Sequence, residues 1–291
     1  MEQPTCETPL DQLPLTVVDF ETTGLHPWGG DAVIEVGAVL VDGLEIAAGP
    51  HLTALVDPGR PSSRSAFEVH GISDEQLHGQ PPFGEVLPEL LDLLSGRVMA
   101  GHNVGFDLGF LRSEMRRLDQ EPLPLAVVDT ALLARVLLRS GGQGYGLAQV
   151  AERLEVPEEG GTPHRALPDA VRTAHVLVHL LQGMIDAGVL TLGDLQRRCA
   201  EVAVNSGRCR GGVEPGVIDA VMDAIRGHQS VEITYVSPHG QVTPAGRIPL
   251  ETRRVIEPVS LRGLWVDAFC HLRNDLRTFR LDRIQNFDTG D

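Results

Sequence analysis

The segment VVDFETTGL, residues 17–25, decides the fold of the first part of the chain. The apolar run at residues 15–18 predicts a buried strand that carries two acids, Asp19 and Glu21, at its end. Because side chains alternate along a strand, both carboxylates face the same way, about 6–7 Å apart along the chain. Two anions this close repel each other unless a cation lies between them. Carboxylate oxygens suit Mg²⁺ or Mn²⁺, so the segment indicates either a metal site or a solvated strand end with two incidental acids.

The size and composition of the chain favour two folded domains. The chain has 291 residues, of which 42% are hydrophobic, which is enough for packed cores. It contains no apolar run of about 18 residues, so we expect neither a transmembrane helix nor a membrane partner. Residues 1–13 are acidic and contain proline, which predicts a disordered lead-in rather than a signal peptide. Four scattered cysteines without a CxxC pair indicate free thiols in a cytoplasmic protein.

The charge of the chain restricts how it can contact nucleic acid. A net charge of -16 argues against a generally basic binding surface, so any such contact must be local. All 24 basic residues are arginine, which can grip phosphate with two hydrogen bonds. A G+C-rich genome explains the missing lysine equally well, and we favour that explanation.

Strands and helices alternate over the first two thirds of the chain and predict an α/β fold. Further strands are expected at residues 32–41, 46–56, 97–100 and 126–128, and helices at 83–94, 106–115, 130–138, 147–154 and 164–184. Beyond a Gly-rich linker, a helix at 215–227 and short strands at 231–236, 254–261, 264–270 and 276–281 predict a small β-barrel-like module.

Two later acids fall in the first turns of predicted helices. Asp107 lies in GHNVGFD, and Asp169 lies in HRALPD, five residues after His164. Together with Asp19 and Glu21 they give four carboxylates, which need cations to share one pocket. Two divalent ions about 4 Å apart could clamp a phosphodiester. Histidine is a common general base in enzymes, so His164 would act as the general base on the attacking water; alone, it would be read as a solvated loop residue.

The motifs DFETTGL, GHNVGFD and HRALPD occur in the order found in the DEDDh 3′→5′ exonucleases, and over roughly residues 15–184 the chain resembles this family. The family includes the proofreading epsilon subunit of bacterial DNA polymerase III. The resemblance implies an RNase H-like α/β fold with a mixed sheet and release of nucleoside 5′-monophosphates from a free 3′ end. It also implies that His164 activates water and that two Mg²⁺ or Mn²⁺ ions are held by Asp19, Glu21, Asp107 and Asp169.

The same resemblance implies a set of substrate contacts. The loop VHGI corresponds to a family segment that touches the terminal nucleotide, and Pro168 departs from the commoner family pattern, so it could shift the neighbouring carboxylate slightly. The implied substrate-binding residues are Thr22, Leu25, His70 and Asn103, of which the last could instead brace the metal loop and His70 could instead be a surface turn residue.

Residues from about 228 resemble a WYL domain, a small Sm-like barrel found in bacterial regulators. The matching stretches are VEITY, RRVIEPVSL, GLWVDAFC and RTFRLDRI, and only Trp265 remains of the naming triplet. Arginines in this module could bind phosphates of a single strand, or could form ordinary salt bridges with Asp267, Asp275 and Asp282. The candidate arginines are Arg254, Arg277, Arg280 and Arg283.

The sequence therefore predicts a disordered lead-in (1–13), an exonuclease domain (14–186), a linker with a short helix (187–213) and a WYL-like domain (214–291). The expected function is a metal-dependent 3′→5′ exonuclease that prefers single-stranded DNA ends, works in DNA repair or end processing, and has a repair protein or a polymerase as a partner. The alternatives are an RNA-trimming 3′→5′ exoribonuclease and a non-catalytic regulator that senses nucleotides or nucleic acid.

Overall fold

The computed structural model describes residues 3–138, 144–157, 164–206, 212–214, 216–243 and 246–288. Its contacts divide them into two compact units. The first unit holds the described residues of Met1–Pro4, Thr8–Pro122 and Val127–Leu190, and the second holds those of Thr5–Glu7, Leu123–Ala126 and Thr191–Asp291.

The first unit is built on a five-stranded mixed sheet in the order β3-β2-β1-β4-β5. The central strand β1 pairs antiparallel with β2 and parallel with β4, while β2–β3 is antiparallel and β4–β5 parallel. This arrangement confirms the predicted mixed α/β fold. The strands are β1 (Pro14–Thr22), β2 (Val33–Asp42), β3 (Glu45–Leu55), β4 (Val98–Gly101) and β5 (Val127–Asp129).

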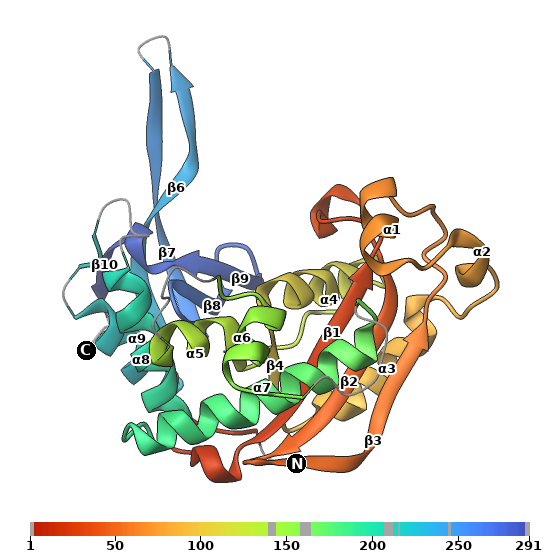
Figure 1. Ribbon diagram of the computed structural model, residues 1–291. Helices are drawn as coiled ribbons and strands as arrows, with labels where there is room; N and C mark the ends of the chain where they lie inside the picture. Colours follow the sequence, from red (N-terminus) through yellow and green to blue (C-terminus); the bar gives the residue numbers. More distant parts are fainter. Residues whose placement is uncertain are drawn as a thin grey trace. The chain divides into compact units, whose positions relative to one another are not determined.

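Helices cover both faces of this sheet (Figure 1), with α7 on one face and α3 and α4 on the other. The longest helix is α7 (Ala166–Asp186), and the opposite face carries α3 (Phe83–Leu94) and α4 (Gly105–Arg117). The remaining helices of the unit are η1 (Leu10–Gln12), η2 (Pro27–Gly29), α1 (Arg64–His70), α2 (Asp74–Leu77), α5 (Thr130–Leu137) and α6 (Leu147–Arg153). Among the described helices, none combines the length and apolar character needed to cross a bilayer.

The segment expected to be a disordered lead-in is ordered where the structure describes it. Leu10 and Leu13 are completely buried, and the amide of Leu10 donates to the carbonyl of Leu190 at 2.9 Å. Acidic and proline-rich composition predicts exposure, but the two leucines of the short η1 turn bury enough apolar surface to fix the segment. The expectation of disorder is therefore wrong for residues 8–13.

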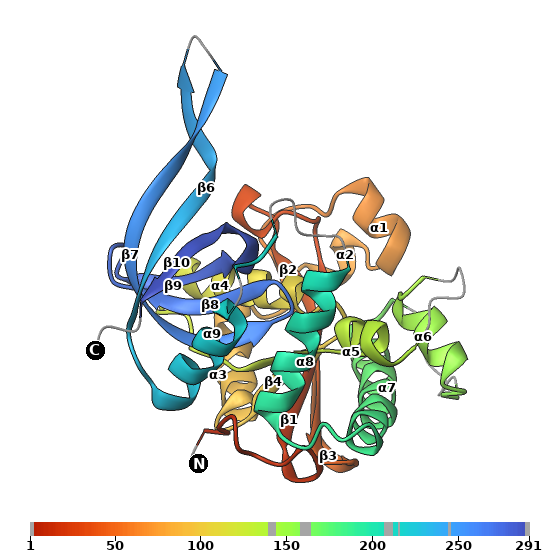
Figure 2. The same cartoon turned by 90° about the vertical axis from the view of Figure 1, so that its left-hand side faces the viewer.

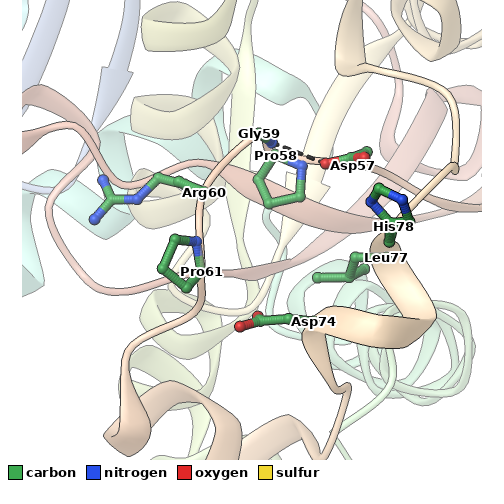
Figure 3. A pocket seen from close by; sticks show the side chains of 8 residues that line it. All are labelled: Asp57, Pro58, Gly59, Arg60, Pro61, Asp74, Leu77 and His78. Carbon is green, nitrogen blue, oxygen red and sulfur yellow. Dashed lines mark hydrogen bonds between the residues drawn. The ribbon is translucent and has the colours of Figure 1, made fainter.

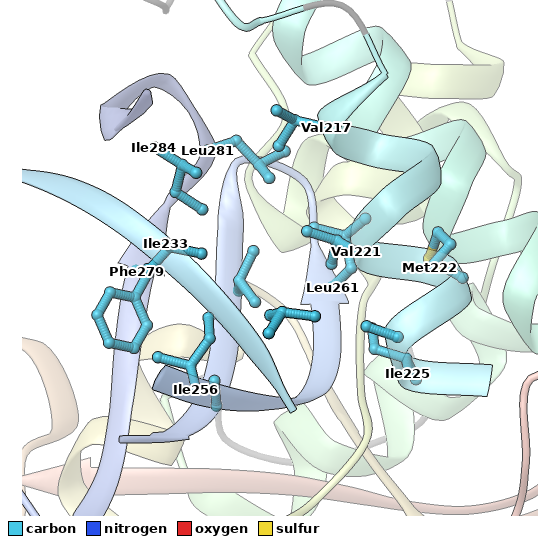
Figure 4. Close-up of a cluster of buried hydrophobic side chains, with 14 of the residues drawn as sticks. Val217, Val221, Met222, Ile225, Ile233, Ile256, Leu261, Phe279, Leu281 and Ile284 are labelled. Atoms are coloured by element: carbon cyan, nitrogen blue, oxygen red, sulfur yellow. The ribbon is translucent and has the colours of Figure 1, made fainter. Parts of the chain in front are cut away.

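The second unit contains two helices and a five-stranded antiparallel sheet in the order β10-β6-β7-β8-β9. Figure 4 shows how α9 lays Val217, Val221, Met222 and Ile225 against apolar side chains of the sheet. Strands β9 and β10 are the sheet edges, so among the described residues the expected Sm-like barrel is not closed. The elements are α8 (Leu192–Asn205), α9 (Val217–Gly227), β6 (Val231–Thr243), β7 (Gly246–Arg262), β8 (Trp265–Cys270), β9 (Asp275–Arg280), η3 (Leu281–Arg283) and β10 (Ile284–Asp288), the last of which the sequence does not predict.

Residues from the start of the chain belong to this second unit. Cys6 is buried in its core, its carbonyl accepts from the amide of Gly193 at 2.8 Å, and Glu7 pairs with Arg226 at 2.8 Å. The three described cysteines, Cys6, Cys199 and Cys270, are buried free thiols, as predicted; Cys209 lies outside the described residues.

Strands β6 and β7 continue beyond the sheet as a two-stranded arm, visible in Figures 1 and 2. Strand β8 pairs with β7 only from Ile256 onward, and β10 pairs with β6 only up to Tyr235. For the described residues between Val236 and Arg254, the two strands therefore pair only with each other. The sequence predicts shorter strands because residues 237–249 are rich in Pro, Gly and polar side chains.

Candidate metal centre

Three of the four predicted acids come together at the end of β1. Asp19 and Glu21 lie on one face of that strand, and Asp169 comes from the first turn of α7. Each of the three offers one carboxylate oxygen, and these oxygens all lie within 4.8 Å of one another. Alternation along the strand predicts the first pair, while the third requires α7 to approach β1 closely.

The fourth acid, Asp107, lies beside this trio and is fixed against the backbone of β1. It sits in the first turn of α4, only 4% exposed, and its Oδ1 accepts a hydrogen bond from the amide of Phe20 at 3.0 Å. Phe20 separates Asp19 from Glu21 along the strand, so this bond holds the Asp107 carboxylate next to both.

Burial and mutual repulsion raise the pKa of every acid in the group. The pKa of Glu21 rises to about 7, chiefly through burial and then through Asp169 and Glu35, and burial raises the pKa of Asp107 to about 8. The pKa of Asp19 lies well above its usual range because of burial and the charges of Asp107 and Glu21, and burial also raises that of Asp169. Such a site holds protons at neutral pH unless cations replace them. This donor set of crowded carboxylate oxygens fits hard divalent cations.

Gly37 allows α7 to come this close. It pairs with Asp19 in the sheet, and a Cβ atom at Gly37 would lie 2.3 Å from the carbonyl carbon and oxygen of Ala166. Because no side chain fits there, the first turn of α7 rests directly on the backbone of β2 and brings Asp169 to the end of β1. A glycine within an otherwise apolar strand signals such an approach, but it was not used in the sequence analysis.

An ion pair between a buried carboxylate and a partly exposed arginine anchors the same helix end. Glu35, opposite Glu21 in the sheet and only 2% exposed, accepts hydrogen bonds from Nε and Nη2 of Arg165 at 2.6–3.0 Å. It also accepts from the amide of Ala166 at 3.0 Å. A carboxylate in the middle of an apolar strand was a signal for this contact that the sequence analysis missed.

His164 lies directly before this anchored segment. Its side chain is exposed, its backbone has a φ of 60°, and its amide donates to Oδ2 of Asp169 at 3.2 Å. This hydrogen bond from the backbone amide holds His164 next to one of the clustered acids, so its imidazole lies at the edge of the carboxylate cluster.

His70 is buried, with 5% of its surface exposed. Its Nδ1 accepts a hydrogen bond from the amide of Ile72 at 3.0 Å, and burial lowers its pKa. The neutral ring therefore carries its proton on Nε2, an atom that is buried and has no hydrogen-bond partner among the described residues. A buried donor without a partner is costly in the free protein and suits a ligand acceptor.

The other three predicted contact residues differ in exposure. Leu25 is 73% exposed, whereas Thr22 is buried and its hydroxyl donates to the carbonyl of Gly24 at 2.7 Å. Asn103 is exposed with a φ of 58°, and its amide donates to Oδ1 of Asp129 at 3.0 Å. Only Leu25 and Asn103 thus present accessible side chains.

A separate surface pocket of about 400 Å³, shown in Figure 3, holds none of these residues. Asp57 accepts from the amides of Gly59 and Gly79 at 2.9 and 3.2 Å, and Asp74 accepts from that of Ser62 at 3.0 Å. The carboxylates of Asp57 and Asp74 are used to hold loop backbone, so we do not assign this pocket a metal-binding role like that of the cluster at the end of β1. Its lining residues are Asp57, Pro58, Gly59, Arg60, Pro61, Asp74, Leu77 and His78.

The candidate arginines of the second unit are largely engaged within it. Arg280 pairs with Asp282 at 2.6 Å and lies over the ring of Trp265 at 5.3 Å. Arg277 pairs with Asp275 at 3.4 Å. Arg254 lies over the rings of Tyr235 and Phe279 at 5.7 and 5.8 Å, and Arg283 is partly buried. The salt bridges with Asp275 and Asp282 match the alternative that the sequence left open.

Comparisons with known proteins agree with this geometry. Residues 16–177 match the RNase T exonuclease family, and residues 216–289 match the WYL domain. The chain is 36% identical over 194 residues to a DNA polymerase III subunit epsilon-like protein of Rhodobacter capsulatus, a match that takes in 66% of this chain and 27% of that relative. It is 33% identical over 171 residues to the DNA polymerase III subunit epsilon of Rickettsia conorii, covering 57% of this chain and 73% of that protein.

Solved structures show the same fold in the first unit. The nuclease domain of 3′hExo, a DEDDh family member bound to rAMP, is similar with a TM-score of 0.51 and 19% identity, over 60% of this chain and 92% of that one. The chain spans well under a third of the length of the Rhodobacter relative, at 27%.

Proposed function

Because the chain belongs to the RNase T exonuclease family over residues 16–177 and carries a WYL domain over residues 216–289, we propose that it is a metal-dependent 3′→5′ exonuclease. It releases nucleoside 5′-monophosphates from DNA, prefers single-stranded 3′ ends, and serves DNA repair or end processing, alone or beside a polymerase or repair partner. The observation that carries this proposal is the group of carboxylate oxygens from Asp19, Glu21 and Asp169 within 4.8 Å of one another.

The proposed metal ligands are Asp19, Glu21, Asp107 and Asp169. When bound, two divalent cations, Mg²⁺ or Mn²⁺, supply Lewis-acid stabilisation of the charge on the phosphodiester. The raised pKa values support this role, since each carboxylate gains more from a cation than it would in open solvent.

His164 is the proposed general base. It removes a proton from the attacking water, and its place beside Asp169 supports this role. Its exposed position allows the imidazole to approach once the substrate is seated.

The proposed substrate contacts lie at the same end of the sheet. His70 donates from Nε2 to an oxygen of the terminal nucleotide, and its orphaned buried donor supports this assignment. Leu25 packs against the terminal nucleoside, as its 73% exposure allows. Thr22 and Asn103 stabilise the loops that follow β1 and β4, through the hydrogen bonds of the Thr22 hydroxyl to Gly24 and of the Asn103 amide to Asp129.

The second unit has a proposed role in substrate capture or regulation. We propose that the functional domains run over residues 14–186 and 214–291, joined by residues 187–213. Arg254, Arg277, Arg280 and Arg283 are the candidate phosphate contacts of this unit. Deletion of residues 214–291 tests this role, since an unchanged affinity for single-stranded DNA would contradict it.

Labelled oligonucleotides test the proposed activity. With Mg²⁺ or Mn²⁺, a 5′-labelled DNA single strand is expected to shorten stepwise, while a 3′ label is released at once as mononucleotide. Asp19→Ala removes this activity, and Glu89→Ala, at an exposed position of α3, serves as the control. Faster digestion of the matched RNA would favour the exoribonuclease alternative, which a 2′-hydroxyl contact would explain. No digestion of either strand would leave only a nucleic-acid-sensing regulator.

A further inference from the structure

The loop between β1 and β2 displays an indole that the fold does not bury. Trp28, in the short helix η2, is 61% exposed, more than any other Trp or Phe among the described residues. A large aromatic surface in water gains free energy when a flat apolar partner covers it. A nucleobase is such a partner, because every base offers a π face.

The loop is held firmly in its exposed position by α4. The carbonyl of Pro27 accepts from the hydroxyl of Ser113 at 2.9 Å and from Arg117 at 3.2 Å. Arg117 also donates to the carbonyl of Asp31 at 2.8 Å, and the carboxylate of Asp31 accepts from the amide of His26 at 2.9 Å. A site fixed in this way loses little conformational entropy when a ligand binds.

Positive charge gathers around the indole. The guanidinium of Arg116 lies over its ring at 5.0 Å, Arg117 follows on the same helix, and Arg60 donates to the carbonyl of Gly30 from the other side. Three guanidinium groups thus lie around the loop, of which Arg60 pairs with Asp31 and Arg117 with Glu114. In a chain of net charge -16 this is the kind of local phosphate contact that the composition requires.

Helix α4 also sets the distance from the carboxylate cluster. Asp107 lies in its first turn, while Ser113 and Arg117, which hold the loop, follow six and ten residues later. A rise of about 1.5 Å per residue puts them about 9 and 15 Å along the helix from Asp107. A stacked strand advances about 3.4 Å per nucleotide, so this distance corresponds to about three or four nucleotides.

We propose that Trp28, Arg60, Arg116 and Arg117 form a platform that binds single-stranded nucleic acid upstream of the 3′ end. A base about three or four nucleotides from the terminus stacks on the indole, and the arginines contact the adjoining phosphates. Bases in an intact duplex are already stacked, so the platform selects unpaired strands. This inference rests on the proposed function and gives it a physical source of single-strand preference.

The two tryptophans of the chain allow a direct test. In a Trp265→Phe background Trp28 is the only fluorophore of its kind, and it is titrated with phosphorothioate oligothymidylates of one, two, four and eight nucleotides in Mg²⁺. Quenching is expected with four and eight nucleotides and not with one. Quenching that is equal at every length, or absent at every length, overturns the platform.

Substitutions separate the platform from the catalytic centre. Trp28→Ala is expected to weaken binding of the eight-nucleotide strand about 5- to 100-fold, the range measured for loss of one base–aromatic stack, with a smaller loss for two nucleotides. Trp28→Phe keeps most of the affinity, and Leu190→Ala, at another exposed apolar position of the unit (55%), leaves it unchanged. A wild-type protein that digests DNA while Trp28→Ala binds all lengths normally refutes the platform alone. A wild-type protein that neither binds nor digests any strand refutes the proposed function as well.

Discussion

Replacing Glu21 with glutamine is expected to raise the free energy of unfolding of the metal-free protein. In saturating metal the variant is expected to be less stable than the wild type. The pKa of Glu21 rises from an ordinary 4.5 to about 7 in the fold, mainly because the carboxyl is buried. The folded state then keeps a proton that the unfolded state has released between these two pH values, so the free energy of unfolding falls as pH rises through that window. The difference corresponds to about 3 kcal/mol at pH 8. Asp107 and Asp19 act in the same direction and feel the charge of Glu21, so the effects of single substitutions will not add.

The assay is urea unfolding in EDTA, followed by far-UV circular dichroism. At pH 8 Glu21→Gln should raise the free energy of unfolding by up to about 3 kcal/mol. At pH 4.5 it should raise it by less than about 0.5 kcal/mol, because the folded carboxyl is then protonated and so is about half of the unfolded population. Glu89→Gln, on the exposed side of α3, should change neither value. Saturating Mn²⁺ should reverse the order, since binding at a thousandfold excess over Kd adds about 4.1 kcal/mol to a protein whose site is intact. A variant no more stable than wild type at pH 8 in EDTA would refute the idea of a strained cluster of carboxylates.

Three further substitutions test how the site is assembled. His164→Ala should lower turnover by about 10²–10⁴-fold, measured on 5′-labelled DNA, while the stabilisation by Mn²⁺ stays near the wild-type value. Gly37→Ala forces Ala166 away from β2, since the added Cβ would lie 2.3 Å from its backbone; a displacement near 1 Å should cut kcat up to about 10²-fold. Arg165→Ala leaves the buried carboxylate of Glu35 unpaired and should lower the free energy of unfolding by about 3–5 kcal/mol in urea titrations. Glu35→Gln should cost less, because the amide oxygen still accepts from the backbone.

For each of these variants, one outcome would contradict the prediction. Full activity of His164→Ala would exclude it as the base, and a wild-type kcat for Gly37→Ala would mean that α7 can shift without moving Asp169. If Arg165→Ala unfolds like wild type, the bidentate pair contributes nothing to the position of the helix.

The sequence predicts the position of each acid within its own strand or helix better than the contacts between these elements. Asp19 and Glu21 are placed on one face by the period of a strand alone, and Asp107 and Asp169 are placed in first turns by their position before helical patterns. The structure describes each of these placements as predicted. Local periodicity is sufficient here because neighbouring residues in the chain decide which way each side chain points.

Contacts between distant segments are what the sequence could not supply. The bond from Phe20 to Asp107 and the pair of Arg165 with Glu35 join residues 87 and 130 positions apart. No local sequence pattern predicts contacts between residues so far apart in the chain. Gly37 and Glu35 did, however, stand out as a glycine and an acid within an otherwise apolar strand. The same limit explains the arm of β6 and β7: its polar sequence predicts a loop, and only the partner strand makes it extended.

Cys6 completes the core of a unit whose other residues come mainly from the far end of the polypeptide, and Glu7 adds an exposed ion pair to the same unit. During translation these first residues leave the ribosome almost 200 positions before α8, so they wait exposed until the last third of the protein has been made. A fragment that begins at residue 191 lacks Cys6 and Glu7. A truncation that removes the second unit exposes the thiol of Cys6 to solvent.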